Sequence, residues 1–92
     1  MFQLKIHKDA QKVLKKTPLR IKKKAFVCLS YFMHKGIDNI PYPIKKLQGD
    51  FRKFEYFEVK IDKDYRIIYR FDRFNETFYI RYAGTHNALG TG

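Results

Sequence analysis

The sequence predicts an α+β fold with the element order β-α-α-β-β-β, in which a helical hairpin packs on one face of an antiparallel sheet. Two observations carry this prediction. Apolar residues recur at helical spacing in the first half of the chain, and they alternate with polar residues in the second half. At 92 residues the chain has the length of one small domain, so we expect a single domain over residues 1–92.

A short strand and a helix are expected first. Phe2, Leu4 and Ile6 alternate with polar residues, which predicts a half-buried strand over residues 2–6. The spacing becomes helical over residues 8–16, where apolar side chains fall on one side and lysines on the other. This helix should therefore turn a basic face to solvent.

A second helix is expected from Thr17-Pro18 to about Lys35. Thr17 suits the N-cap and Pro18 the first helical position, while Gly36 suits the position that ends the helix. The only cysteine, Cys28, rules out an internal disulfide and is expected to be a buried structural thiol. The apolar stripe that we expect this helix to bury comprises Leu19, Phe26, Leu29 and Met33.

Three consecutive antiparallel strands should follow a loop over residues 37–46. The Asp62-Lys63-Asp64 segment and residues 72–76 fit the turns between them. In the last strand, strict alternation puts Phe78, Ile80 and Tyr82 on one face. The strands that we expect cover residues 56–61, 65–71 and 78–82.

The polar face of the first two of these strands concentrates charge. If the turn pairs them, Lys60 and Arg66 lie near one another, with Asp64 at the turn. Like charges on facing positions repel, and an anionic ligand would offset that repulsion. Interleaved Glu58 and Asp64 would offset it too, and a plain solvated sheet face explains the pattern equally well.

The whole chain is strongly basic. Its formal net charge of +11 exceeds the roughly 2–8 charges that keep a small domain in solution. Such a surface attracts phosphate backbones, anionic membranes or an acidic protein. The sequence carries neither a signal-peptide pattern nor an apolar run long enough to span a membrane, so we expect a cytoplasmic protein without membrane partners.

Motifs for cofactors and metals are absent from the sequence. It contains no GxGxxG, no Walker A motif and no HExxH, and three scattered histidines and one cysteine give no metal-ligand spacing. We therefore expect no cofactor and no metal. One histidine, His86, follows the last expected strand, where an exposed imidazole could exchange protons near neutral pH. Taken alone, a single exposed histidine is more often incidental.

Three segments together resemble the RelE/ParE toxin superfamily. Leu47-Gln48-Gly49 is similar to the L-x-G that precedes the sheet in these toxins, and residues 64–69, DYRIIY, resemble their D/E-x-R-I/L-I/V-Y strand. Residues 82–89, YAGTHNAL, resemble the ending of the YafQ-like branch, G-T/S-H-x-x-L. The resemblance covers nearly the whole chain and implies the RelE-like fold.

The resemblance also implies site residues. His86 matches the C-terminal catalytic histidine of the YafQ-like branch, and Asp64 matches its acidic residue at the start of the central strand. Arg66 matches the arginine that RelE-type enzymes use on the scissile phosphate. Lys60 stands where YafQ-like members carry a histidine, so the acid–base set combines features of two branches.

The implied function is that of a type II toxin that cuts mRNA in the A site of the 70S ribosome and is neutralised by an antitoxin with an acidic segment. A ParE-like gyrase inhibitor without nuclease activity, or an inactive nucleic-acid-binding relative, is the alternative. For any one lysine a solvated surface is the simpler explanation. The basic residues that we expect to bind ribosomal RNA or mRNA are Lys15, Lys16, Lys22, Lys23, Lys24, Lys45, Lys46, Arg52 and Arg81.

Overall fold

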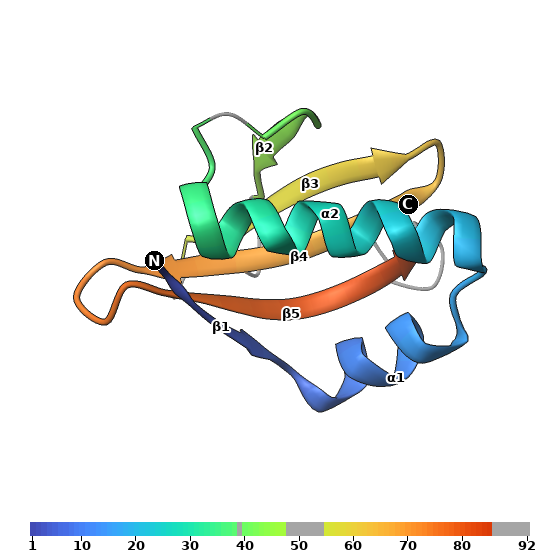
Figure 1. Cartoon of the computed structure of the whole chain (residues 1–92), viewed down its shortest axis with the longest axis horizontal. Coiled ribbons are helices and arrows are strands. Elements are labelled where there is room, and N and C mark those ends of the chain that lie inside the picture. The colour runs from blue at the N-terminus through green and yellow to red at the C-terminus, as the bar shows by residue number, and fades with distance from the viewer. Residues whose placement is uncertain (39, 48–54, 86–92) are drawn as a thin grey trace.

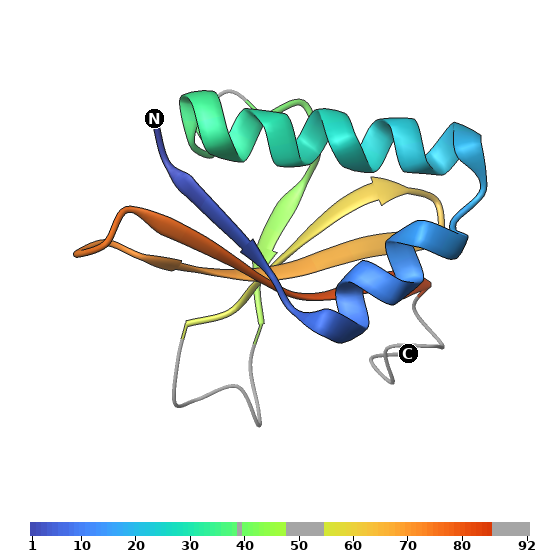
Figure 2. The same cartoon turned by 60° about the horizontal axis from the view of Figure 1, so that its bottom comes forward.

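Two helices pack against a twisted five-stranded sheet in the computed structural model, which describes residues 1–38, 40–47 and 55–85 (Figures 1 and 2). The strand order in the sheet is β1-β5-β4-β3-β2. The predicted α+β class and the order of the predicted elements are confirmed. The elements are β1 (Gln3–Ile6), α1 (Lys8–Lys16), α2 (Leu19–Lys35), β2 (Ile44–Lys46), β3 (Phe57–Asp62), β4 (Tyr65–Asp72) and β5 (Thr77–Thr85).

The sheet is mixed, so the prediction of an antiparallel sheet holds only for part of it. Strands β2 to β5 pair antiparallel in succession, whereas β1 pairs parallel with β5, with Leu4 opposite Phe78. Hairpin connections force neighbouring strands to run antiparallel, but β1 and β5 lie far apart in the sequence and no hairpin joins them. The parallel pair therefore follows from the connectivity.

One strand, β2, lies inside the segment that the sequence predicts as a loop. Ile44 pairs with Val59 and Lys46 with Phe57, which places β2 at the edge of the sheet. Pro43 precedes the strand, and its carbonyl accepts a hydrogen bond from the backbone N–H of Lys60 at 3.0 Å. Proline lacks an N–H but keeps its carbonyl, so it is tolerated at the start of an edge strand.

The buried face of α2 differs from the predicted stripe. Leu29 is buried as expected, but the exposed fractions of Leu19 and Phe26 are 66% and 55%. Residues three or four positions apart face the same side of a helix. On the buried side of α2 some of these side chains are small, so the helix can pack close to the sheet. The residues that α2 buries are Ala25, Cys28, Leu29 and Phe32.

The junction between the helices also differs from its prediction. Thr17 ends α1 rather than capping α2, whose N-cap is Pro18. The Thr17 hydroxyl donates to the Val13 carbonyl at 2.7 Å and shares a 2.8 Å hydrogen bond with the Tyr65 hydroxyl. Thr17 is thus a buried tie between α1 and the central strand.

Two sequence predictions at α2 are confirmed. Gly36 ends the helix with a φ of 68°, a left-handed conformation that glycine adopts at low cost. Cys28 is fully buried, and this burial raises the pKa of its thiol to about 12. A thiol that stays protonated at neutral pH is inert as a nucleophile, so Cys28 belongs to the core.

The sheet has one face that packs into the core and one without a helix over it in the described part of the chain. Helix α2 lies across the first face, contacting β3 and β1, while α1 packs along β5 (Figure 2). Core side chains from β4 include Ile67 and Tyr69, whereas their neighbours Arg66, Ile68 and Arg70 point to the other face. We call this second face the open face.

A bulge in β5 changes which side chains reach each face. Ile68 pairs with Tyr82 and Tyr69 pairs with Ile80, so Arg81 is an extra residue in the strand. Beyond the bulge Ala83, instead of the predicted Tyr82, joins the core. Bulges re-aim side chains and recur near functional sites, and this one turns Tyr82, the partner of Ile68, to the open face.

Candidate active site on the open face

The sheet register brings the predicted pair Lys60 and Arg66 together. The two residues are directly paired across β3 and β4. Asp64 lies in the turn that joins these strands, as the sequence predicts, and its carboxylate oxygen Oδ1 is 3.9 Å from Arg66 Nη1. Three of the four predicted catalytic residues are therefore neighbours at one end of the open face.

Arg66 is held between two carboxylates, with its Nε at Glu58 and its Nη1 near Asp64. Its side chain is only 12% exposed, and its Nε donates a 2.7 Å hydrogen bond to Glu58 Oε1. Its Nη1 is buried and has no hydrogen-bond partner among the described residues. A buried guanidinium N–H without a partner is costly, and a ligand oxygen would satisfy it.

Glu58 belongs to the site, although the sequence interpretation gave it only as one of two carboxylates that could offset the Lys60–Arg66 repulsion. Its side chain is 4% exposed, and beside the Arg66 contact its Oε1 lies 4.0 Å from Lys45 Nζ. A buried carboxylate persists only when cations and hydrogen bonds compensate its desolvation. The available signal was a glutamate between the apolar Phe57 and Val59 of a central strand, where an uncharged residue is usual.

A cavity of about 190 Å³ opens beside these residues. Three cations and one carboxylate line it, so its electrostatic character is positive. Lys45, predicted as an RNA-docking lysine, lies on β2 at this cavity because that strand pairs with β3. The residues that line the cavity are Pro43, Ile44, Lys45, Glu58, Lys60 and Arg66.

Two predicted site residues, His86 and Arg52, lie outside the described residues. The strand that leads to His86 is described as far as Thr85. Gly84 pairs with Arg66, and Thr85 pairs with Tyr65. The catalytic role of His86 stays a prediction.

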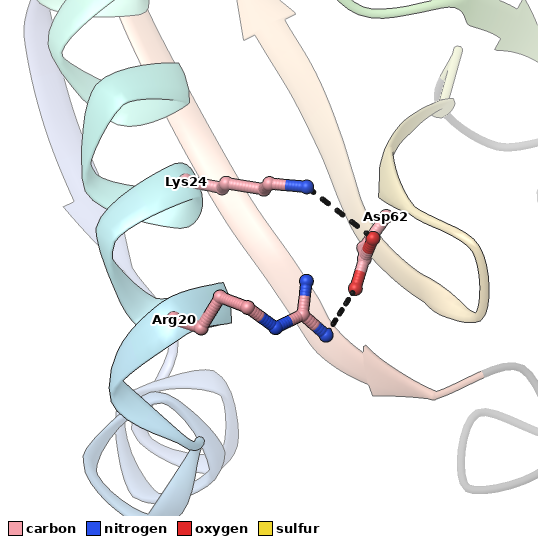
Figure 3. Close-up of polar contacts among 3 residues, drawn as sticks. All are labelled: Arg20, Lys24 and Asp62. Carbon is pink, nitrogen blue, oxygen red and sulfur yellow. Dashed lines mark hydrogen bonds and ion pairs between the residues drawn. The ribbon is translucent and has the colours of Figure 1, made fainter.

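The predicted docking lysines of the helices divide into two groups. Lys24 Nζ and Arg20 Nη2 lie 3.4 and 3.3 Å from the carboxylate of Asp62, which ties α2 to the end of β3 (Figure 3). Lys22 Nζ donates to the Lys15 carbonyl at 3.0 Å. These contacts engage Lys22 and Lys24 inside the molecule. Among the predicted docking lysines of the helices, those with exposed side chains are Lys15, Lys16 and Lys23.

Helix α2 with its lysines and the cavity at Arg66 lie on different sides of the sheet. The core face of β3 and β4 meets α2, whereas Arg66 belongs to the opposite face. Lys46, at the edge of the sheet, pairs with Glu55 at 3.3 Å. Arg81 lies at the bulge of β5, and its guanidinium stacks on the Tyr82 ring at 4.4 Å. The basic surface is therefore divided between a helical side and a sheet side.

Two features are absent from the described residues. No three His, Cys, Asp or Glu side chains among them gather closely enough to hold a metal ion. Neither helix in these parts of the chain is long and apolar enough to cross a membrane.

The arrangement of two helices on this sheet is the fold of the RelE, YoeB and YafQ toxins. The RelE-like fold that the resemblance implies is thereby confirmed. No protein-family model matches the sequence, and no curated protein is significantly similar to it. The likeness therefore rests on the three-dimensional structure.

Three solved structures illustrate this likeness. YafQ from E. coli strain BL21(DE3) superposes with a TM-score of 0.78 at 18% identity, over 97% of this chain and 98% of YafQ. RelE in the archaeal RelE-RelB complex from Pyrococcus horikoshii OT3 gives a TM-score of 0.75 at 19% identity, over 91% and 93%. The YoeB dimer from Staphylococcus aureus gives 0.73 at 17%, over 92% and 97%.

Proposed function

We propose that this protein is the toxin of a type II toxin–antitoxin system and that it cuts mRNA in the ribosomal A site as an endoribonuclease. The observation that carries the proposal is Arg66, whose buried Nη1 has no hydrogen-bond partner among the described residues and whose side chain lines a positive cavity. A guanidinium suits the bidentate binding of phosphate oxygens. The fold shared with RelE, YoeB and YafQ supports the same function.

The chemistry needs a base, a charge clamp and an acid, because RNA supplies its own nucleophile. Asp64 or His86 removes the proton of the 2′-OH, and the 2′-oxygen attacks the adjacent phosphorus. Arg66 and Lys60 stabilise the charge that develops on the phosphate oxygens. The other member of the Asp64–His86 pair protonates the 5′-oxygen as its bond to phosphorus breaks. The products are a 2′,3′-cyclic phosphate and a free 5′-hydroxyl, and no metal is required.

Glu58 acts as a positioning residue in this mechanism. Its carboxylate binds Arg66 Nε at 2.7 Å and so leaves the terminal nitrogens of the guanidinium for the phosphate. The second, weaker contact to Lys45 keeps another cation at the rim of the cavity. A guanidinium fixed in this way loses little side-chain freedom when the phosphate binds.

The net charge of +11 supports docking on ribosomal RNA. Multiple cationic contacts to phosphates give salt-sensitive binding that does not depend on sequence. The predicted docking lysines of the helices that are exposed, Lys15, Lys16 and Lys23, are the best candidates for this docking. Arg52 and the strand residues Lys45 and Arg81 complete the proposed set.

A cognate antitoxin is the second proposed partner. The similar RelE from P. horikoshii was solved in complex with RelB, and the similar YafQ of E. coli in a DinJ-YafQ toxin–antitoxin complex. An acidic segment that folds on binding would match the basic surface of this chain.

Induction of Arg66→Ala and His86→Ala variants in a bacterial host tests the proposal. The parent should arrest growth, and primer extension should map cuts within translated mRNA that end in cyclic phosphates. Arg66→Ala should slow cleavage about 10²- to 10³-fold, the range for losing one charge-stabilising donor. Arg66→Lys should recover little, because lysine cannot bind two oxygens in a fork. Lys12→Ala, an exposed change on α1 outside the proposed docking set, is the matched control.

Two outcomes would contradict the proposal. Growth arrest without mRNA cuts, together with inhibited supercoiling by purified gyrase, would favour a ParE-like inhibitor. Harmless induction of the parent would favour an inactive nucleic-acid-binding protein.

A further inference from the structure

A second cavity lies on the open face and shares no lining residue with the cavity at Arg66. Its volume is about 300 Å³, at the lower end of the range for ligand pockets. Its polar and aromatic lining residues are Lys5, His7, Tyr56, Arg70, Tyr79 and Arg81. We call it the tyrosine groove.

The sheet register fixes where the tyrosine groove lies relative to Arg66. Arg70 pairs with Tyr79, and Tyr79 pairs with Lys5, so the three side chains form a row across β4, β5 and β1. Arg70 follows Arg66 by four residues on the same face of β4. At about 3.3 Å per residue, the row lies about 13 Å along the strand from the proposed cleavage site.

The tyrosine groove is built for stacking. The Arg70 guanidinium lies 4.1 Å from the centre of the Tyr79 ring, and Lys5 Nζ lies 5.9 Å from the same ring. These cation–π contacts hold the guanidinium flat against the tyrosine. Tyr56 lines the cavity as well. Aromatic rings and guanidinium planes are the surfaces on which proteins stack unpaired bases.

The charge of the tyrosine groove suits an anionic ligand. Lys5, Arg70 and Arg81 bring three cations to it, and the Nη1 of Arg81 is buried without a hydrogen-bond partner among the described residues. Two carboxylates of the described residues lie near it: Asp9 Oδ2 is 3.7 Å from Nδ1 of the lining His7, and the pKa of Asp72 is lowered by its hydrogen bonds with Asn75 and also by the Arg70 charge. Cations therefore outnumber the nearby carboxylates in the groove.

We propose that the tyrosine groove binds a base of single-stranded RNA, from a nucleotide that flanks the phosphate cut at Arg66. The inference rests on the proposed function and adds a binding site to it. A base stacks on the Tyr79–Arg70 pair and Tyr56, while Lys5 and Arg81 bind the neighbouring phosphates. An acidic peptide would satisfy the cations, but it would not use the stacked rings, so RNA fits the whole set of residues better.

Binding of two ligands to the purified full-length chain tests this inference. The first is a short single-stranded oligonucleotide with 2′-O-methyl groups, which the protein cannot cut because the attacking hydroxyl is blocked. The second is an abasic chain of the same length and charge. Fluorescence anisotropy at low salt should show that the parent prefers the base-bearing strand. Stacking of one base corresponds to a preference of about 5- to 150-fold.

The Tyr79→Leu variant should lose that preference and bind both ligands alike, whereas Tyr79→Phe should keep it, because the ring remains. Tyr31→Leu is the matched control: Lys35 Nζ lies 5.8 Å from the Tyr31 ring on α2, away from the open face. Lys16→Ala should weaken both ligands equally, since it removes charge and no stacking surface.

Equal affinities of the parent for the two ligands would overturn the inference, as would an unchanged preference in Tyr79→Leu. If Tyr79→Leu weakened an acidic peptide but not the RNA, the groove would be a peptide site. Because the RNA ligand cannot be cut, the result does not depend on catalysis. Failure of this inference with mRNA cleavage intact would leave the proposed function standing.

Discussion

The two faces of the sheet are built from the same strands but carry different kinds of side chain. The covered face is apolar and aromatic, and its rings contact one another, as in the Phe32–Phe78 stack with centroids 4.7 Å apart. The open face holds buried or half-buried charges, and two of its buried donors, Arg66 Nη1 and Arg81 Nη1, have no hydrogen-bond partner among the described residues and belong to side chains that line cavities. Since side chains alternate along a strand, neighbouring residues serve stability and chemistry separately.

Tyr69 is the exception on the covered face. Its hydroxyl is buried and has no hydrogen-bond partner among the described residues. Burial raises the pKa of this phenol, so the hydroxyl stays protonated. The residue still acts as a core aromatic, with its ring centroid 4.7 Å from that of Phe32. The comparison of the two faces therefore predicts that substitutions on each face affect different measurable properties.

The largest expected effect on stability comes from Phe32→Ala on the covered face. Phe32 is fully buried between Phe78 and Tyr69, and truncation of a buried phenylalanine costs about 3–5 kcal/mol. Urea denaturation should show this loss in the free energy of unfolding. Phe26→Ala, in the same helix but 55% exposed, should change it by less than about 0.5 kcal/mol. Similar losses for both variants would contradict the assignment of the buried face.

On the open face, the Glu58–Arg66 pair should separate stability from activity. Glu58→Leu leaves Arg66 buried without its partner, which should cost about 3 kcal/mol or more. The double variant Glu58→Leu/Arg66→Met removes both charges, so it should regain most of that stability while mRNA cleavage stays lost. Thermal unfolding and primer extension measure the two properties. A double variant as unstable as the single one would refute the view that the pair serves the site and not the fold.

A smaller effect is expected at the tie between α1 and β4. Thr17→Val removes the partner of the buried Tyr65 hydroxyl and should cost about 1–3 kcal/mol. Thr17→Ser keeps the hydroxyl and should lose much less. Tyr65→Phe combined with Thr17→Val should cost less than the sum of the two single changes, because no buried donor is then left unpaired. Additive losses in denaturation experiments would exclude the coupling.

Periodicity predicted the elements and the pairing of Lys60 with Arg66, because both follow from local alternation and one tight turn. It did not predict β2, since three residues after Pro43 carry too little pattern, and only pairing with β3 makes them a strand. Periodicity did not predict the bulge at Arg81 either, because the bulge depends on how β5 pairs with Ile68 and Tyr69 of β4.

The sequence likewise predicted those parts of the candidate site that lie within one strand and its turn. The type and spacing of Asp64 and Arg66 carry the family resemblance, whereas the role of Glu58 depends on its burial and its 2.7 Å contact with Arg66. The tyrosine groove combines residues from β1, β4 and β5, which are neighbours only in the folded sheet. Sequence patterns report one strand at a time, so sites assembled across strands remain hidden from them.

The smallest expected effect concerns the ion pairs of Asp62 with α2, on the covered side of the sheet (Figure 3). A hydrogen bond from the backbone N–H of Lys63, and then the Lys24 and Arg20 cations, hold the pKa of the Asp62 carboxyl below its usual value. A lowered folded-state pKa contributes stability above the unfolded pKa of about 3.9, and this contribution is lost as the pH falls through the folded-state value.

The parent should therefore lose stability below about pH 4, and Asp62→Asn should weaken that dependence in acid denaturation. Lys24→Gln should also weaken the pH dependence of stability, because it removes one of the cations that pair with Asp62. Lys23→Gln, which removes the same charge from the exposed neighbouring residue, is the control. Parallel acid-denaturation curves for the parent and Asp62→Asn would show that these ion pairs contribute nothing to the attachment of α2.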